Sequence, residues 1–132
     1  MSSDTIIEKI CRLPIEFYGG SKSMVELVAE AGINEYPSVL TSENIAKYVR
    51  DHPALVDQWL TWSANKRTDS GWYFARQRDE FIVGFYPKGD SLRFEDQTAA
   101  CVEYIVREVK AIMQIRRRKD CAHSGLGGAM RR

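Results

Sequence analysis

The fold is decided by residues 72–94, which read Trp72-Tyr73-Phe74-Ala75, then Phe81-Ile82-Val83-Gly84-Phe85-Tyr86, then Ser91-Leu92-Arg93-Phe94. All three segments are rich in residues that favour strands, and polar turn residues separate them. The pattern therefore predicts a three-stranded antiparallel β-meander. Half of the fourteen aromatic residues fall within this stretch, so we expect the sheet to anchor the core.

Because side chains alternate between the two faces of a strand, the stretch divides into two sets. The first set is uniformly apolar, and we expect it to face helices. Its members are Trp72, Phe74, Phe81, Val83, Phe85, Leu92 and Phe94.

The second set mixes tyrosines, an arginine and small residues, which is the composition of an interface more than of a core. We expect it to contact a partner protein, unless further helices cover it. Its members are Tyr73, Ala75, Gln77, Ile82, Gly84, Tyr86, Ser91 and Arg93. Together with two acids of the first turn, the candidate partner-binding residues are Tyr73, Asp79, Glu80, Tyr86 and Arg93.

Apolar residues recur at helical spacing on both sides of the predicted sheet. Upstream, four helices are predicted: one begins near Asp4 and is ended by Pro14, one runs from Ser23 to Gly32, one is opened by Thr41 or Ser42, and one follows His52-Pro53. Downstream, Asp96 is expected to cap a long helix. The fold class is therefore α+β, with N-terminal helices, the meander, and a long C-terminal helix packed on the sheet.

Charge divides the chain at residue 115. The net charge of +1 is the sum of −4 over residues 1–115 and +5 over residues 116–132. We therefore expect a single α+β domain over residues 1–115 and a basic, Gly-containing flexible tail over residues 116–132.

Hydropathy and cysteine content indicate the cellular compartment in which the protein is expected. No apolar run approaches the roughly 20 residues of a membrane span, and the first residues do not resemble a signal peptide. The three cysteines fit no disulfide framework, and Cys11 and Cys101 lie in helical apolar patterns typical of buried thiols. The sequence predicts a cytoplasmic protein with no membrane association.

Few residues could carry out catalysis. The two histidines are His52, at a helix junction, and His123, in the predicted tail beside Cys121. A mobile Cys-His pair provides no oriented base, and the tail has too few ligands for a metal site. We therefore predict no catalytic residue, no metal and no cofactor.

The strongest local feature is the run Arg116-Arg117-Arg118-Lys119. Four consecutive cations could bind the phosphates of a nucleic acid in a salt-dependent way. Two other interpretations are a solvated helix C-terminus and a tail that docks on the acidic body of another copy.

The stretch from Ser70 to Ile112 includes S-G-W-Y-F, F-I-V-G-F-Y-P-K-G, L-R-F-E-D and A-C-V-E-Y-I-V-R-E-V-K-A-I. It resembles small bacterial α+β proteins of the immunity-protein type, from polymorphic or contact-dependent toxin systems. The resemblance implies a non-enzymatic protein that neutralises a cognate toxin, and it transfers no functional residue. An acidic body would suit a basic, nuclease-like toxin.

Two other functions remain open at this point. One is a nucleic-acid-associated or regulatory protein that uses the basic tail, and the other is a small enzyme of unrecognised type. The sequence also leaves homo-oligomer formation open.

Overall fold

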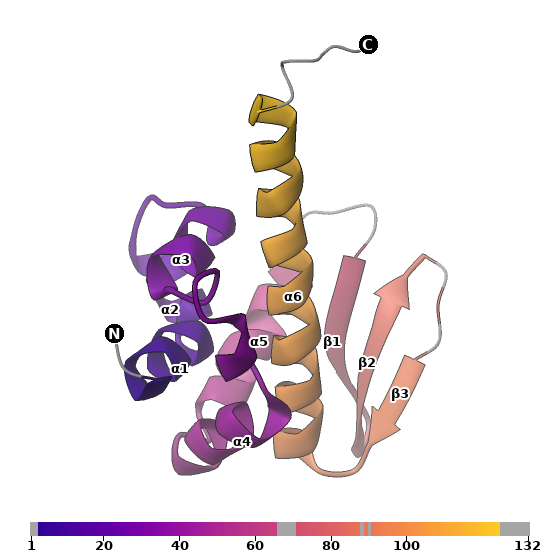
Figure 1. Ribbon diagram of the computed structural model, residues 1–132. Helices are drawn as coiled ribbons and strands as arrows, with labels where there is room; N and C mark the ends of the chain where they lie inside the picture. The colour runs from indigo at the N-terminus through magenta and orange to yellow at the C-terminus, as the bar shows by residue number, and fades with distance from the viewer. Residues whose placement is uncertain (1–2, 66–70, 88, 90, 125–132) are drawn as a thin grey trace.

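A three-stranded antiparallel sheet in the order β1-β2-β3 forms one side of the molecule (Figure 1). The computed structural model describes residues 3–65, 71–87, 89 and 91–124, with side chains up to residue 115. The strands are β1 (Gly71–Gln77), β2 (Glu80–Tyr86) and β3 (Ser91–Phe94). The predicted meander and the α+β class are confirmed.

Strands β1 and β2 are joined by the two-residue turn Arg78-Asp79, because Gln77 pairs directly with Glu80. Arg78 has a φ of 58°, in the left-handed region that tight hairpin turns require. The turn therefore sets the register by which Trp72 pairs with Phe85 and Phe74 with Val83.

The helices lie on one side of the sheet (Figure 1). One was not predicted: the chain after Cys11 forms a separate short helix in which Pro14 occupies the first turn. Proline is favoured there because its missing N–H has no intrahelical partner at that position. The elements are α1 (Ser3–Cys11), α2 (Leu13–Gly19), α3 (Met24–Ala31), η1 (Pro37–Val39), α4 (Ser42–Asp51), α5 (Leu55–Asn65) and α6 (Gln97–Ser124).

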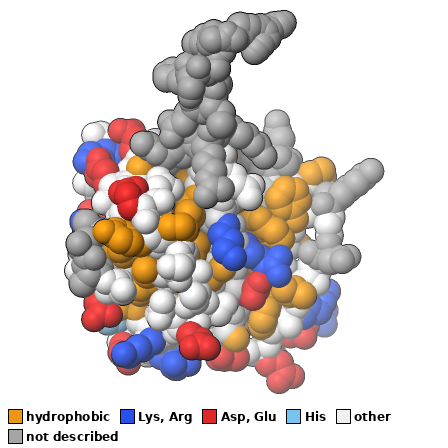
Figure 2. All heavy atoms as spheres, viewed as in Figure 1, with side chains coloured by type: hydrophobic (Ala, Val, Ile, Leu, Met, Phe, Trp, Pro, Cys, Tyr) orange, Lys and Arg blue, Asp and Glu red, His pale blue; other side chains and the backbone are white. Residues whose placement is uncertain are grey.

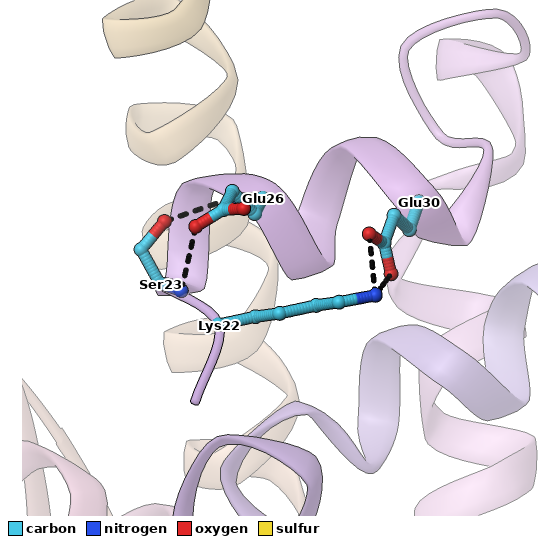
Figure 3. A network of polar contacts seen from close by, with 4 residues as sticks. All are labelled: Lys22, Ser23, Glu26 and Glu30. Carbon is cyan, nitrogen blue, oxygen red and sulfur yellow. Dashed lines mark hydrogen bonds and ion pairs between the residues drawn. The ribbon is translucent and has the colours of Figure 1, made fainter. Parts of the chain in front are cut away.

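Both predicted ends of α3 are confirmed. The Ser23 side chain accepts from the backbone N–H of Glu26, whose carboxylate accepts from the Ser23 N–H, forming a capping box (Figure 3). Gly32 ends the helix in the left-handed conformation, with a φ of 93°. An exposed ion pair between Lys22 and Glu30 spans the same helix (Figure 3).

Helix α6 begins where predicted, because the Asp96 carboxylate accepts hydrogen bonds from the N–H groups of Thr98 and Ala99. It packs against α3, α4 and α5 on one side and against the sheet on the other, so it is the central element of the core. Its buried side chains include Val102, Ile105, Val109, Ile112 and Met113, which recur at helical spacing.

Helix α6 extends beyond residue 115 into the segment predicted as a tail, and its backbone is helical through Ser124. This agrees with the interpretation of the basic run as part of a helix C-terminus. Arg and Lys are good helix formers, and cations near a helix C-terminus interact favourably with its dipole, so the helix continues without an apolar face. Residues 125–132 of the predicted tail lie outside the described residues.

The predicted alternation of the sheet is largely observed. Phe74, Phe81 and Val83 are buried in the core, and Trp72 and Phe94 pack partly against it. Two residues of the same set, Phe85 and Leu92, remain 38% and 39% exposed because the helices do not cover that corner of the sheet.

Candidate functional site

The candidate site is the face of the sheet that points away from the helices, here called the open face. Helices α5 and α6 make the main contacts with the sheet, and α6 packs over the face that carries Phe74 and Val83. Among the described elements, none covers the opposite face. By strand register, the open face consists of Tyr73, Ala75, Gln77, Glu80, Ile82, Gly84, Tyr86, Ser91 and Arg93.

Four of the five predicted partner-binding residues therefore share one face: Tyr73, Glu80, Tyr86 and Arg93. Asp79 lies in the adjoining hairpin turn and is exposed. Tyr86 is 60% exposed, and Tyr73 is half-buried. Neither tyrosine is covered by the protein's own helices, so both remain available to a partner.

Tyr73 is half-buried because its ring lies across Gly84, its direct neighbour on β2. A Cβ atom built on Gly84 would lie 2.6 Å from the Tyr73 hydroxyl oxygen and 2.7 Å from Cζ, closer than any side chain could approach. Gly84 thus leaves the space in which the tyrosine ring lies flat on the sheet. Strand alternation predicts Gly84 on this face, but nothing in the sequence pattern indicates that Gly84 makes room for the Tyr73 ring.

A charged pair lies beside this aromatic contact. The Arg93 guanidinium on β3 donates to the Glu80 carboxylate on β2 at 3.2 Å; the Arg93 side chain is exposed and the Glu80 side chain is partly exposed. Ile82, directly opposite Arg93, is only 9% exposed although it lies on the open face. The open face therefore has a buried aliphatic residue, two tyrosines and a compensated charge pair.

The other side of the sheet holds a buried polar cluster. The Trp62 indole N–H donates to the Glu108 carboxylate at 3.2 Å, and the backbone N–H of Phe74 donates to the Ser63 hydroxyl at 2.7 Å. Tyr104 lies between them, with its ring stacked on Phe74, and burial raises the pKa of its hydroxyl. Sequence analysis missed Glu108, although its position four residues after Tyr104 and four before Ile112 on the buried stripe could have revealed it.

This cluster joins α5, β1 and α6 inside the core. Glu108 is 6% exposed and Trp62 is 8% exposed, so neither presents a reactive group at the surface. The arrangement is that of a core hydrogen-bond network that fixes the sheet on the helices.

The predicted burial of two cysteines is confirmed. Cys11 and Cys101 are both buried and free. Burial raises the pKa of the Cys11 thiol to about 12 and that of Cys101 further, so both thiols are protonated at neutral pH and are poor nucleophiles. The side chain of Cys121 lies outside the described residues.

His52, predicted at a helix junction, is the C-cap residue of α4. Its ring stacks on Tyr48 with 4.1 Å between ring centroids, and its Nδ1 lies 3.0 Å from the Tyr48 carbonyl oxygen. His123 has a described backbone only.

The surface also contains an open groove of about 760 Å³ between α4 and the start of α6. Glu43, Lys47 and Arg50 line it from α4, and Asp96 and Glu103 from the other side. Glu103 pairs with Arg107, whose guanidinium lies over the Trp72 ring. Charges of both signs on exposed side chains make this groove a solvated surface.

The described part of the chain shows neither a metal-ligand cluster nor a membrane-spanning helix. No group of three or more His, Cys, Asp or Glu residues there is arranged as metal ligands would be. Likewise, no described helix is both long enough and apolar enough to cross a bilayer.

The four cations of the predicted nucleic-acid site, Arg116, Arg117, Arg118 and Lys119, occupy consecutive positions on the helical backbone of α6, far along the chain from the open face. Their side chains lie outside the described residues. The fold thus separates the two predicted binding regions onto different elements.

Comparison with known proteins adds no assignment, because no family model, curated protein or solved structure matches this chain.

Proposed function

We propose that this protein acts by binding another protein through the open face, and that the partner is a bacterial toxin which the contact neutralises. One observation carries the proposal: two tyrosines and an Arg-Glu pair lie on a sheet face that no described helix covers. The toxin partner follows from the resemblance to immunity-type proteins, and the protein-binding surface follows from the chemistry of the face.

The composition of the open face supports protein recognition. Tyr and Arg are enriched among the residues that dominate binding energy, because they combine a large contact area with a polar group. Tyr86 is the more exposed of the two tyrosines, and Tyr73 is already ordered by its contact with Gly84. Since an ordered side chain loses little conformational entropy on binding, Tyr73 is well suited to anchor a partner.

The negative net charge of residues 1–115 favours a basic partner. Residues 1–115 carry a net charge of −4, and Asp79 lies exposed at the β1–β2 turn beside the open face. An acidic surface speeds the association of a basic protein by electrostatic steering. A basic nuclease-like toxin fits this surface better than an acidic one.

The test is to express this protein together with the product of its neighbouring gene and to measure growth and direct binding. We expect growth to be restored, and Tyr86→Ala to weaken binding at least about tenfold, as for a central interface tyrosine. Tyr36→Ala is the matched control, because Tyr36 is 51% exposed and lies outside the sheet. A neighbouring product that is neither bound nor neutralised contradicts the toxin assignment; equal binding by both variants contradicts the use of the open face.

A second candidate function is nucleic-acid binding through the end of α6. The observation in its favour is that the helical backbone continues through all four cations at 116–119, which makes this segment part of an ordered element. Four cations on an ordered element can neutralise several phosphates at once.

A further inference from the structure

The two edges of the sheet differ. At the β1 edge, the Phe74 N–H is bound by the Ser63 hydroxyl of α5, and α5 packs along this strand. At the other edge lies β3, beyond which no described element continues the sheet (Figure 1). An uncovered edge strand presents backbone donors and acceptors to any strand that can pair with it.

Apolar side chains are exposed next to this open edge. Leu92 on β3 is 39% exposed, Phe85 on β2 is 38% exposed, and Phe94 is half-buried, all on the face that α6 partly covers. Figure 2 shows hydrophobic side chains on the part of the surface that the sheet forms beside α6. A strand paired with β3 would extend the sheet and place its own side chains beside these residues.

The charge at the edge favours a second copy of this chain as the occupant. Arg93 is the one charged residue of β3, and it is already paired with Glu80 of the same chain. Within the described strand Ser91–Phe94, therefore, no uncompensated charge requires an acidic or basic partner. An electrically compensated, apolar edge is complementary to itself.

We propose that two copies pair through β3, antiparallel, about a twofold axis that passes by Leu92, so that the two sheets form one six-stranded sheet. In this register Leu92 lies opposite Leu92 of the second copy, and Ser91 lies opposite the second copy's Arg93. Like charges are therefore not directly opposed.

The proposed dimer is a closed assembly, and its interface is small. Among the described strands, β3 offers the one uncovered edge of the sheet. Twofold pairing through β3 occupies this edge in both copies, so the assembly closes as a dimer and does not continue into a fibre. The strand has four residues, so the contact is at the low end of interface sizes and the dimer is expected to form reversibly. It leaves both open faces uncovered and is independent of the toxin proposal.

Sedimentation velocity of the full chain over about 1 μM to 1 mM tests the pairing. We expect the mass to rise from 15.1 kDa toward twice that value. Leu92→Lys places two cations together on the axis and is expected to weaken the dimer at least about tenfold. Tyr86→Lys makes the same charge change on the other face of the same hairpin and is expected to leave the dimer intact. A monomer at every concentration, or a dimer indifferent to Leu92→Lys, overturns the proposal.

A cysteine at position 92 tests the register itself. In a Cys121→Ser background, Leu92→Cys is expected to form a disulfide-linked dimer under mild oxidation, because directly opposed residues of paired strands lie within reach of a disulfide. Phe85→Cys, equally exposed but away from the axis, is the control and is expected to remain largely monomeric. If both cysteines cross-link equally, or neither does, the twofold axis does not pass by Leu92.

Discussion

The Tyr73 ring lies across Gly84 on the neighbouring strand, in space that a single methyl group at position 84 would fill. Gly84 has ordinary strand geometry and no positive φ, so its small size matters here and its conformational freedom does not. This one contact determines where the central aromatic residue of the open face lies.

The first prediction is that Gly84→Ala destabilises the protein only while Tyr73 is present. We expect a loss of about 1–3 kcal/mol in the free energy of unfolding, because the ring must move off the sheet. In a Tyr73→Ala background, the same change should be neutral or stabilising, since Ala fits a strand interior better than Gly. Urea denaturation of the four proteins in the cycle measures the coupling; equal losses in both backgrounds would mean that the ring does not occupy this space.

The second prediction concerns the buried acid. Glu108→Ala leaves the Trp62 indole N–H without its acceptor inside the core, and we expect a loss of about 1–3 kcal/mol. Glu108→Gln keeps an acceptor oxygen and should retain most of the stability. Glu103→Ala, on the same helix but in a partly exposed ion pair with Arg107, should change stability by less than about 1 kcal/mol. A Glu108→Ala protein as stable as Glu103→Ala would rule out a structural role for the cluster.

The sheet was predictable because a period of two and strong turn residues specify both the strands and their faces. The alternation placed Tyr73, Tyr86 and Arg93 on one face, and the observed register confirms that placement. Their binding of a partner stays a prediction, since partner contacts leave no periodic pattern in one chain.

Three features of the structure are not predictable from the sequence pattern, each for a physical reason. The helix Leu13–Gly19 is not predicted because a proline after an apolar helical pattern normally ends a helix, whereas Pro14 occupies the first turn of a new one. The extension of α6 to Ser124 was missed because the apolar period stops at residue 115, while the intrinsic helix propensity of Arg and Lys continues. The contact between Tyr73 and Gly84 depends on a side-chain conformation, which strand alternation does not specify.

The third prediction is alkaline destabilisation. The unfolded Cys11 thiol loses its proton near its ordinary pKa of 9.0, whereas in the folded protein burial raises that pKa to about 12. Below pH 9 both states are protonated and the full stability is present. Between pH 9 and about 12, the unfolded state binds fewer protons, so the free energy of unfolding falls as pH rises, by about 1.4 kcal/mol per pH unit for each such group.

Denaturation at pH 8, 9 and 10 measures this slope. The pKa of Cys101 is raised by the same cause, so Cys11→Ala and Cys101→Ala should each reduce the slope at the expense of overall stability. A native protein whose thiols all react rapidly with a disulfide reagent at pH 8 would contradict the buried, protonated state of these two cysteines.

The last prediction separates the two candidate functions by their dependence on the end of α6. If this segment binds nucleic acid, the affinity of the full chain for duplex DNA should fall with salt, with a slope of log K against log salt concentration of up to about −4 for four phosphate contacts. Replacing residues 116–119 by glutamine removes the charge while keeping residues that favour a helix, and should abolish this affinity without lowering the melting temperature. The same variant should still neutralise a toxin, because the open face is unchanged. Toxin neutralisation that is lost with the four cations would place the partner on α6, and DNA affinity that survives their removal would exclude them as the nucleic-acid site.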